Sequence, residues 1–154
     1  MTVRSILIFI FYLFLTNCGF KVVDQNYLKG FHIIPNIEGD DRIVYLLSNH
    51  LRTNSSGNTN KILINAEIKK NKDIKEKNIK NEITKYEINI LTLISYEILD
   101  ENKSGSYQVE KGGFYNVNKK HSVTLNNEKK LIKDLVKKIS EQILNDLRLN
   151  LNDL

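Results

Sequence analysis

Apolar and polar residues alternate along two stretches of the chain, residues 61–69 and residues 84–99. A period of two places successive side chains on opposite faces of a strand, so both stretches are predicted to be β-strands with one buried face. In the longer stretch Leu91 and Leu93 interrupt the polar face, so we expect its middle to be covered on both sides or to contact a partner. The predicted buried positions are Ile62, Ile64, Ala66, Ile68, Tyr86, Ile88, Ile90, Thr92, Ile94, Tyr96 and Ile98.

Two other stretches repeat apolar residues every three or four positions, which is the pattern of amphipathic helices. The first follows Gly39, with Asp40 and Asp41 as acidic N-cap candidates and Arg52 in its last turn. Its apolar face contains Ile43, Val44, Leu47 and Leu51. The second runs from about Asn126 to Leu149, with an apolar stripe of Leu131, Ile132, Leu135, Val136, Ile139, Ile143 and Leu147 and with Lys129, Lys130, Lys133, Lys137 and Lys138 on the other face.

The remaining segments complete a small sheet. Residues 31–35 are predicted to form a short strand that ends at Pro35, and residues 106–117 a fourth strand with a bulge at Gly112-Gly113. Residues 100–105 are predicted to form a turn, and the almost wholly polar residues 70–81 an extended, mobile hairpin tip. The expected fold class is therefore α+β, a two-layer sandwich of one sheet of about four strands covered by two helices. Ile88, Ile90 and Ile94 are expected to pack against Leu135, Ile139 and Ile143.

The amino-terminal segment has a different character from the rest of the chain. Arg4 precedes ten apolar or aromatic residues, 6–15, which is too short for a membrane-spanning helix and typical of a signal peptide. Leu15-Thr16-Asn17-Cys18 then resembles a bacterial lipobox, although Asn17 stands where Gly, Ala or Ser is usual. We expect residues 1–17 to be a lipoprotein signal peptide that is removed, Cys18 to carry the lipid, and residues 18–154 to form a single periplasmic domain. The alternative is an incidental thiol at Cys18.

Charge and composition narrow the classes of function. The chain has 23 Lys and Arg against 18 Asp and Glu, a formal net charge of +5, which favours anionic lipid or phosphate groups as partners. Export argues against a nucleic-acid partner. His32, His50 and His121 lack ligand spacing, and no nucleophile elbow or phosphate-binding loop occurs. Glu82, Glu87, Glu97 and Glu110 fit a solvated strand face better than a catalytic pair, so we expect no enzyme, no metal site and no cofactor.

The order of elements adds a resemblance to a known family. Cys18-Gly19-Phe20 follows the predicted cleavage site, then come a strand, a helix and three further strands, with Phe114-Tyr115-Asn116-Val117 in the last of these and an amphipathic helix at the end. This arrangement resembles the LPS-assembly lipoprotein family, the LptE-like proteins of the outer membrane. Residues 122–127 depart from the Ala-rich start of the last helix that is frequent in that family.

The resemblance implies a location and partners. It implies a protein held by lipid at the periplasmic face of the outer membrane, where it plugs the lumen of the LPS-assembly β-barrel protein (LptD-like), helps that barrel assemble, and binds lipopolysaccharide during its delivery to the outer leaflet. The alternative is another periplasmic lipoprotein, acting as a lipid carrier or as a pilot for a different outer-membrane complex. A carrier requires an apolar cavity, whereas a plug requires a filled core and a polar exterior.

Two groups of lysines are candidates for contact with lipopolysaccharide, which presents phosphates beside acyl chains. Lys119 and Lys120 are favoured because they follow Phe114, Tyr115 and Val117. The second group was expected at the hairpin tip, beside Ile74 and Ile79, where contact with the barrel wall is the favoured role. It consists of Lys69, Lys70, Lys72 and Lys75. Both groups are also compatible with ordinary solvated lysines.

Overall fold

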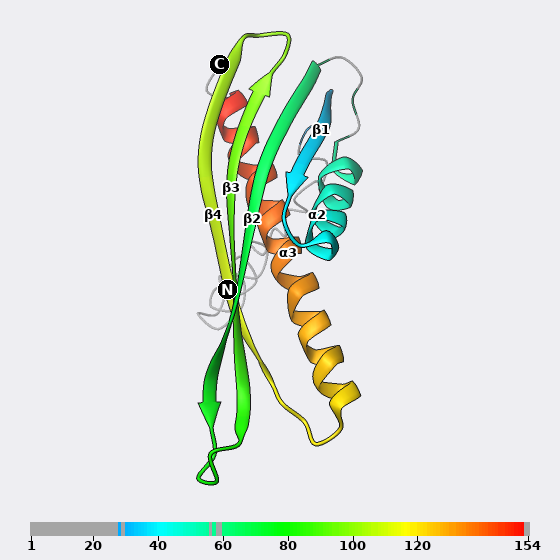
Figure 1. The fold of residues 1–154 in the computed structure, drawn as a ribbon. Helices are drawn as coiled ribbons and strands as arrows, with labels where there is room; N and C mark the ends of the chain where they lie inside the picture. Colours follow the sequence, from blue (N-terminus) through cyan, green and yellow to red (C-terminus); the bar gives the residue numbers. More distant parts are fainter. Residues whose placement is uncertain (1–27, 29, 56, 58–59, 153–154) are drawn as a thin grey trace, which may run out of the picture.

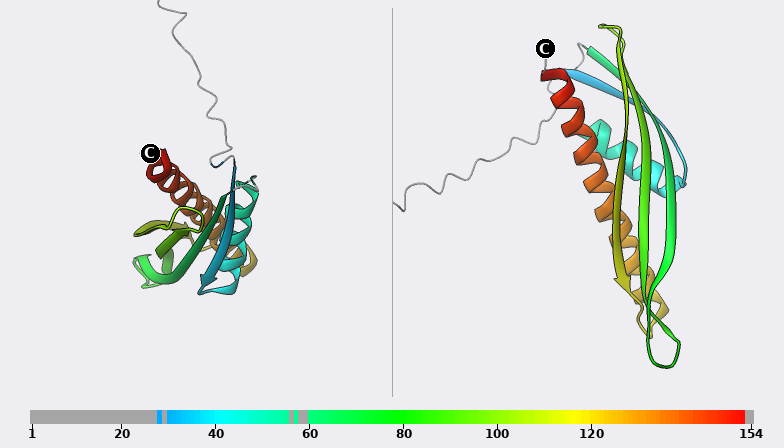
Figure 2. Two further views of the ribbon diagram at one scale, coloured as in Figure 1. Left: turned by 90° about the horizontal axis from the view of Figure 1, so that it is seen from above. Right: turned by 90° about the vertical axis from the view of Figure 1, so that its left-hand side faces the viewer.

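The computed structural model describes residue 28, residues 30–55, residue 57 and residues 60–152 (Figure 1). The predicted signal peptide, residues 1–17, and Cys18 lie outside the described residues. The elements are β1 (Phe31–Glu38), α2 (Asp41–Thr53), β2 (Asn60–Lys77), β3 (Ile83–Ile98), β4 (Lys103–Asn116) and α3 (His121–Asn152). The described strands form one sheet in the order β1-β2-β3-β4, and the two helices pack with it around one core. The predicted α+β sandwich of two layers is confirmed (Figure 2).

β1 is an edge strand that pairs in parallel with β2, and α2 is the crossover between them. The prediction that this strand ends at Pro35 was wrong, because the pairing continues to Glu38. The Asn60 N–H donates to the Gly30 carbonyl, so even-numbered residues of β1 face β2 and the Pro35 nitrogen faces the open edge. A proline there removes no hydrogen bond from the sheet.

The turn from β1 into α2 depends on Gly39. Its φ of +139° lies in a region that other residues rarely adopt, and a Cβ atom would lie 2.8 Å from the Ile68 carbonyl oxygen. Asp40 follows as the N-cap, accepting hydrogen bonds from the N–H groups of Arg42 and Ile43. The predicted N-cap is therefore confirmed, as is the apolar face, in which Ile43, Leu47 and Leu51 are buried and Val44 is partly buried.

β2 and β3 form a hairpin that extends beyond the rest of the sheet (Figure 1). Residues 70–81, predicted to form an extended, mobile hairpin tip, are extended, but most of them belong to a regular strand, because β2 continues to Lys77 and β3 begins at Ile83. Antiparallel pairing with β3 holds this polar stretch, with Lys70 opposite Ile90 and a register shift after Ile74. Backbone pairing needs no apolar side chains, so a polar segment becomes a strand when a long neighbour supplies its hydrogen bonds.

β4 pairs with β3 in an unbroken antiparallel register from Lys103 to Asn116. The predicted bulge at Gly112-Gly113 was therefore wrong, as was the extension of the predicted turn to residue 105. These two glycines make room for side chains. A Cβ atom on Gly112 would lie 2.1 Å from Asn89 Oδ1, and one on Gly113 would lie 2.8 Å from Leu131 of α3.

α3 begins five residues earlier than predicted, at His121, and packs along β4 and against α2. Its buried stripe joins the predicted inner face of β3, so the predicted packing of Ile88, Ile90 and Ile94 in one core with Leu135, Ile139 and Ile143 is confirmed. On the opposite face of β3, Leu91 and Leu93 are half-buried. The described part of the chain places no second layer over that face, so contact with a partner there stays a prediction.

Candidate functional site

The candidate cations lie where the β2–β3 hairpin, the end of β4 and the start of α3 come together (Figure 1). We call this region the distal end and define it as residues 69–87 and 111–128. Strand pairing brings its parts together, since Lys72 lies opposite Ile88, which in turn lies opposite Gly113. α3 crosses the inner face of β4 at this point, with Leu131 above Gly113.

Lys72 occupies the centre of the inner face at the distal end. Its ammonium nitrogen lies 2.7 Å from Glu128 Oε2 of α3, and 4.6 and 5.5 Å from the ring centroids of Tyr86 and Tyr115. The two rings stack with centroids 5.7 Å apart, and the Tyr115 hydroxyl donates to the same Glu128 oxygen at 2.8 Å. A cation in this position is stabilised both by the faces of the aromatic rings and by the carboxylate. Lys72 therefore connects β2, β3, β4 and α3.

The charges in this cluster stabilise one another. Burial raises the pKa of Glu128, but hydrogen bonds from Lys72 and Tyr115 outweigh it and hold the pKa below its ordinary value. Burial likewise lowers the pKa of Lys72, while the bonds to Glu128 and Tyr115 raise it above its ordinary value. Burial is the main reason that the pKa of Tyr115 is raised. Near neutral pH the cluster is an ion pair with a neutral phenol.

The other three lysines of the second predicted group are also paired within the chain. Lys70 contacts the α2 N-cap Asp40 at 2.5 Å, and this hydrogen bond is the main reason that the pKa of Asp40 lies below its ordinary value. On the outer face of the sheet, Lys69 pairs with Glu67 at 3.1 Å. Lys75 contacts both carboxylate oxygens of Glu87 at 3.0 Å.

The four lysines expected at the hairpin tip therefore do not gather in one cluster. All four lysines lie on β2, on both faces of the sheet, while the tip consists of residues 78–82. The tip itself is well structured, because Asn78 Oδ1 accepts hydrogen bonds from the N–H groups of Lys80 and Glu82. It presents Ile79 fully to solvent.

Lys119 and Lys120 lie in the loop between β4 and α3, and both side chains are exposed. Neither ammonium group has an ion pair or a hydrogen bond with any described residue. The loop backbone is nevertheless fixed, because Asn118 Oδ1 accepts from the Lys120 N–H at 3.0 Å and the Asn118 N–H donates to Thr124 Oγ1 at 2.8 Å. The first turn of α3 contains no acidic residue. These two cations are therefore available to an external anion.

The apolar neighbours expected beside Lys119 and Lys120 are only partly available. Phe114 is 59% exposed, whereas Tyr115 is buried and Val117 is half-buried. The expectation that all three would accompany the lysines was wrong for Tyr115, because strand alternation turns its ring under α3. Leu125 in the first turns of α3 adds a second exposed apolar side chain at this end.

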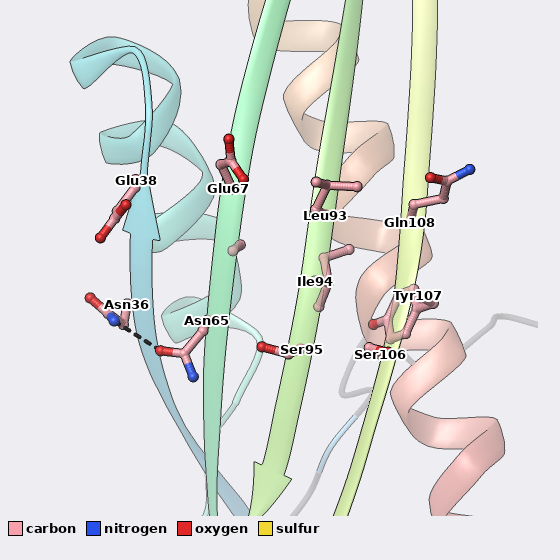
Figure 3. A pocket seen from close by; sticks show the side chains of 11 residues that line it. Asn36, Glu38, Asn65, Glu67, Leu93, Ile94, Ser95, Ser106, Tyr107 and Gln108 are labelled. Atoms are coloured by element: carbon pink, nitrogen blue, oxygen red, sulfur yellow. Dashed lines mark hydrogen bonds between the residues drawn. The ribbon is translucent and has the colours of Figure 1, made fainter.

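A concavity of about 700 Å³ opens on the outer face of the sheet (Figure 3). Polar and apolar atoms contribute nearly equally to its surface, and Asn36 donates to Asn65 across the β1–β2 pair at 2.8 Å. Its exposed polar side chains are Asn36, Glu38, Asn65, Glu67, Ser95, Ser106 and Gln108. The concavity is open to solvent and does not enclose a ligand, so it does not resemble the apolar cavity expected of a lipid carrier.

The described residues contain neither a candidate metal site nor a candidate membrane-spanning helix. Within the described ranges, no three His, Cys, Asp or Glu side chains gather closely enough to hold a metal ion. None of the helices in the described part is both long and apolar enough to cross a membrane.

Sequence reasoning missed the cluster of Lys72, Tyr86, Tyr115 and Glu128. One signal could have indicated part of it. The second predicted strand, residues 84–99, is much longer than the first, residues 61–69, and an antiparallel partner of matching length would extend β2 past Lys72. The contact with Glu128, 56 residues along the chain, has no such local signal.

The fold is shared with solved bacterial proteins. Rare lipoprotein B from Shewanella oneidensis superposes with a TM-score of 0.60 and 11% identity, over 80% of this chain and 97% of that one. Lipoprotein B from Nitrosomonas europaea, itself uncharacterised, gives 0.61 and 14%, over 87% and 93%. A putative lipoprotein from Caulobacter crescentus CB15 gives 0.56 and 10%, over 84% and 93%.

At such low identity these similarities establish the fold alone. No protein-family model matches the chain, and no curated protein sequence matches it. These three solved proteins are named as lipoproteins, and the superpositions cover nearly their whole lengths.

Proposed function

We propose that the chain is a lipid-anchored lipoprotein of the outer membrane that plugs the LPS-assembly β-barrel from the periplasmic side, helps it assemble, and contacts lipopolysaccharide. The observation that carries the proposal is the fold, which the described residues share over most of their length with solved proteins named as lipoproteins. It occurs in a chain whose single cysteine, Cys18, follows a short apolar amino-terminal run.

The packing of the molecule favours a plug over a carrier. One continuous cluster of buried side chains joins the sheet with both helices. The described outer concavity is open and about equally polar and apolar, unlike an enclosed acyl-chain site. A rigid body with a polar outer face suits a water-filled lumen, because it needs to fill space and form hydrogen bonds and needs no catalytic residue.

Lys119 and Lys120 are the proposed contacts for the phosphates of lipopolysaccharide. They are exposed, and no described carboxylate neutralises them. They also precede the positive end of the α3 dipole, which attracts anions. Phe114 and Leu125 offer exposed apolar surface at the same end for the acyl chains next to those phosphates. The four candidate lysines of β2 are less suitable because each of them already has a carboxylate partner; these are Lys69, Lys70, Lys72 and Lys75.

The lipid anchor is tested by mass spectrometry of the protein isolated from membranes. We expect an amino terminus at Cys18 that carries a diacylglyceryl thioether and an amide-linked acyl chain. Cys18→Ala is expected to remove the protein from the membrane fraction, since several acyl chains anchor durably and none would remain. An unmodified amino terminus at another residue would contradict the anchor.

The partners are tested in two steps with the anchor intact. A large outer-membrane barrel should co-purify in stoichiometric amount, and its absence under conditions that preserve the membrane would exclude the plug role. For lipopolysaccharide, the double variant Lys119→Glu/Lys120→Glu should bind more weakly at low salt and show a smaller salt dependence. The matched control, Lys133→Glu/Lys138→Glu, reverses two exposed lysines on α3 away from this loop. Equal losses in both variants would indicate a general charge effect and no site.

A further inference from the structure

The sheet has two edges, and they differ in how they are protected. β1 is short, 8 residues, and contains the only proline of the chain, Pro35, facing the open edge. β4 has 14 residues, no proline and an unbroken register with β3. Short strands, prolines, bulges and charged side chains are the usual protection of sheet edges against pairing with another strand. β4 has none of the first three, and its charged residues, Lys103, Glu110 and Lys111, lie outside the stretch from Ser104 to Val109.

The hydrogen bonds of β4 show which backbone groups its edge presents. The Val117 N–H donates to the Thr84 carbonyl at 2.9 Å, so the odd-numbered residues of β4 bond to β3 and the even-numbered residues face outward. Asn116 agrees with this, since its carbonyl accepts from the Asn127 side chain of α3 at 3.1 Å. The outward N–H and C=O groups of the other even-numbered residues have no partner within the described part of the chain. These residues are Ser104, Ser106, Gln108, Glu110, Gly112 and Phe114, all exposed.

The half of this edge from Ser104 to Val109 is the better docking surface. It carries no charged side chain, whereas Glu110 and Lys111 follow it. Gly105 lies in this half without a side chain, and the Tyr96 side chain fills the space of a Cβ atom there, with two ring carbons and the hydroxyl oxygen at 2.7 Å. Tyr96 and Gly105 together line a pocket on the side of β4 that faces α3.

A pocket of about 390 Å³ lies beside this half, between β4 and the carboxyl-terminal part of α3. Its walls include Tyr107 from β4 and Asp146 and Leu149 from α3. Leu149 is 51% exposed, and Asp146 has no ion pair with a described residue. The carboxylate is close enough to Tyr107 to contribute, after burial, to raising the pKa of that phenol. An apolar wall with one unpaired carboxylate suits a long side chain with a cationic end.

We propose that the β4 edge from Ser104 to Val109 binds an extended segment of a partner protein as a fifth strand. The partner backbone would bond to the outward groups of Ser104, Ser106 and Gln108. A Lys or Arg of the segment, opposite Gly105, would place its stem on Leu149 and its charge at Asp146. This inference does not rest on the proposed function. Every strand of a closed barrel is already paired on both edges, so the added segment cannot be a strand of the barrel wall.

A second copy of this chain is a poorer occupant. Pairing β4 with β4 of another copy about a twofold axis would place the two α3 helices on the same side of one continuous sheet. Each α3 carries five exposed lysines, Lys129, Lys130, Lys133, Lys137 and Lys138, of which only Lys137 has a described carboxylate partner. Like charges brought together in this way oppose association.

The test is amide hydrogen exchange of the full chain in detergent. Free protein should show slow exchange at odd-numbered residues of β4 and fast exchange at Ser106 and Gln108. The probe is a synthetic peptide of about ten alternating Thr and Val residues with one central Lys. At concentrations up to about 1 mM the peptide should slow amide exchange at Ser104, Ser106 and Gln108. No slowing there would overturn the proposal, and slowing that depends on protein concentration without peptide would identify a second copy instead.

Two variants separate edge pairing from folding. Gln108→Pro removes an outward N–H and leaves every bond to β3, so odd-numbered amides should stay protected while peptide affinity falls at least about tenfold. Gln108→Thr keeps the N–H and should bind normally. A peptide with Glu in place of Lys should bind more weakly, and Asp146→Asn should reduce that preference. Unchanged binding to Gln108→Pro would overturn strand addition, and equal binding of the two peptides would overturn the role of Asp146. Neither barrel nor lipopolysaccharide is present, so the result is independent of the proposed function.

Discussion

Replacing Ile90 by Ala opens a cavity in the middle of the sheet. Ile90 is fully buried on β3, between β2 and β4, and belongs to the same core as Leu135 and Ile139 of α3. The change removes three carbon groups, which at about 0.8 kcal/mol each amounts to about 2.4 kcal/mol of lost transfer free energy. The paired strands on both sides limit collapse, so a cavity term adds to it. We expect the free energy of unfolding to fall by about 3–4 kcal/mol.

Urea unfolding measures this loss, with a shift of the midpoint at unchanged slope. The matched control is Ile79→Ala, which makes the same chemical change at a side chain that is fully exposed at the hairpin tip. That variant should stay within about 0.5 kcal/mol of the parent. A loss below about 0.5 kcal/mol for Ile90→Ala, or equal losses for the two variants, would show that the assigned inner face of β3 is incorrect.

Three further changes test other parts of the structure. Thr92→Val should raise the free energy of unfolding by about 1 kcal/mol, because Thr92 is buried and its hydroxyl has no partner among the described residues; thermal unfolding checks this. Gly39→Ala should lower it by about 2 kcal/mol or more, since φ is positive and the Ile68 carbonyl blocks a Cβ atom; full stability would refute the turn geometry. Glu128→Gln should lower the free energy of unfolding at pH 7, and this loss should shrink as the pH falls below 4.5. The reason is that a carboxylate whose pKa is lowered in the folded state loses its stabilising contribution when it is protonated. A loss of stability that stays constant from pH 7 to pH 3 would refute the ion pair with Lys72.

Local features of the sequence determined which residues are buried within each element. Alternation along residues 62–68 and 86–98 and the three-to-four spacing along residues 131–147 identified the inner faces correctly, because side-chain direction follows from the backbone period alone. The N-cap at Asp40 was equally local, since it needs only the N–H groups of Arg42 and Ile43, two and three residues later. The α+β class then followed, because half-buried strands and helices must cover one another.

The limits of the strands were decided by their neighbours in the sheet. β2 extends through its polar half to Lys77 because β3 is long enough to pair with it, and β1 continues past Pro35 because its nitrogen faces an open edge. Gly112 and Gly113 suggested a bulge, but they make room for Asn89 and for Leu131 of α3. Composition cannot show this, because the requirement comes from residues distant in the chain.

The candidate sites were decided almost entirely by tertiary structure. Lys72 and Lys120 look alike in sequence, yet one pairs with Glu128 beside two stacked aromatic rings and the other has no ion pair with any described residue. The open edge at Ser106 and Gln108 exists only because β4 is last in the strand order. A sequence records which residues are charged or can form a strand. Which charges are neutralised and which backbone groups stay unpaired depends on contacts across many residues, and only the assembled fold determines them.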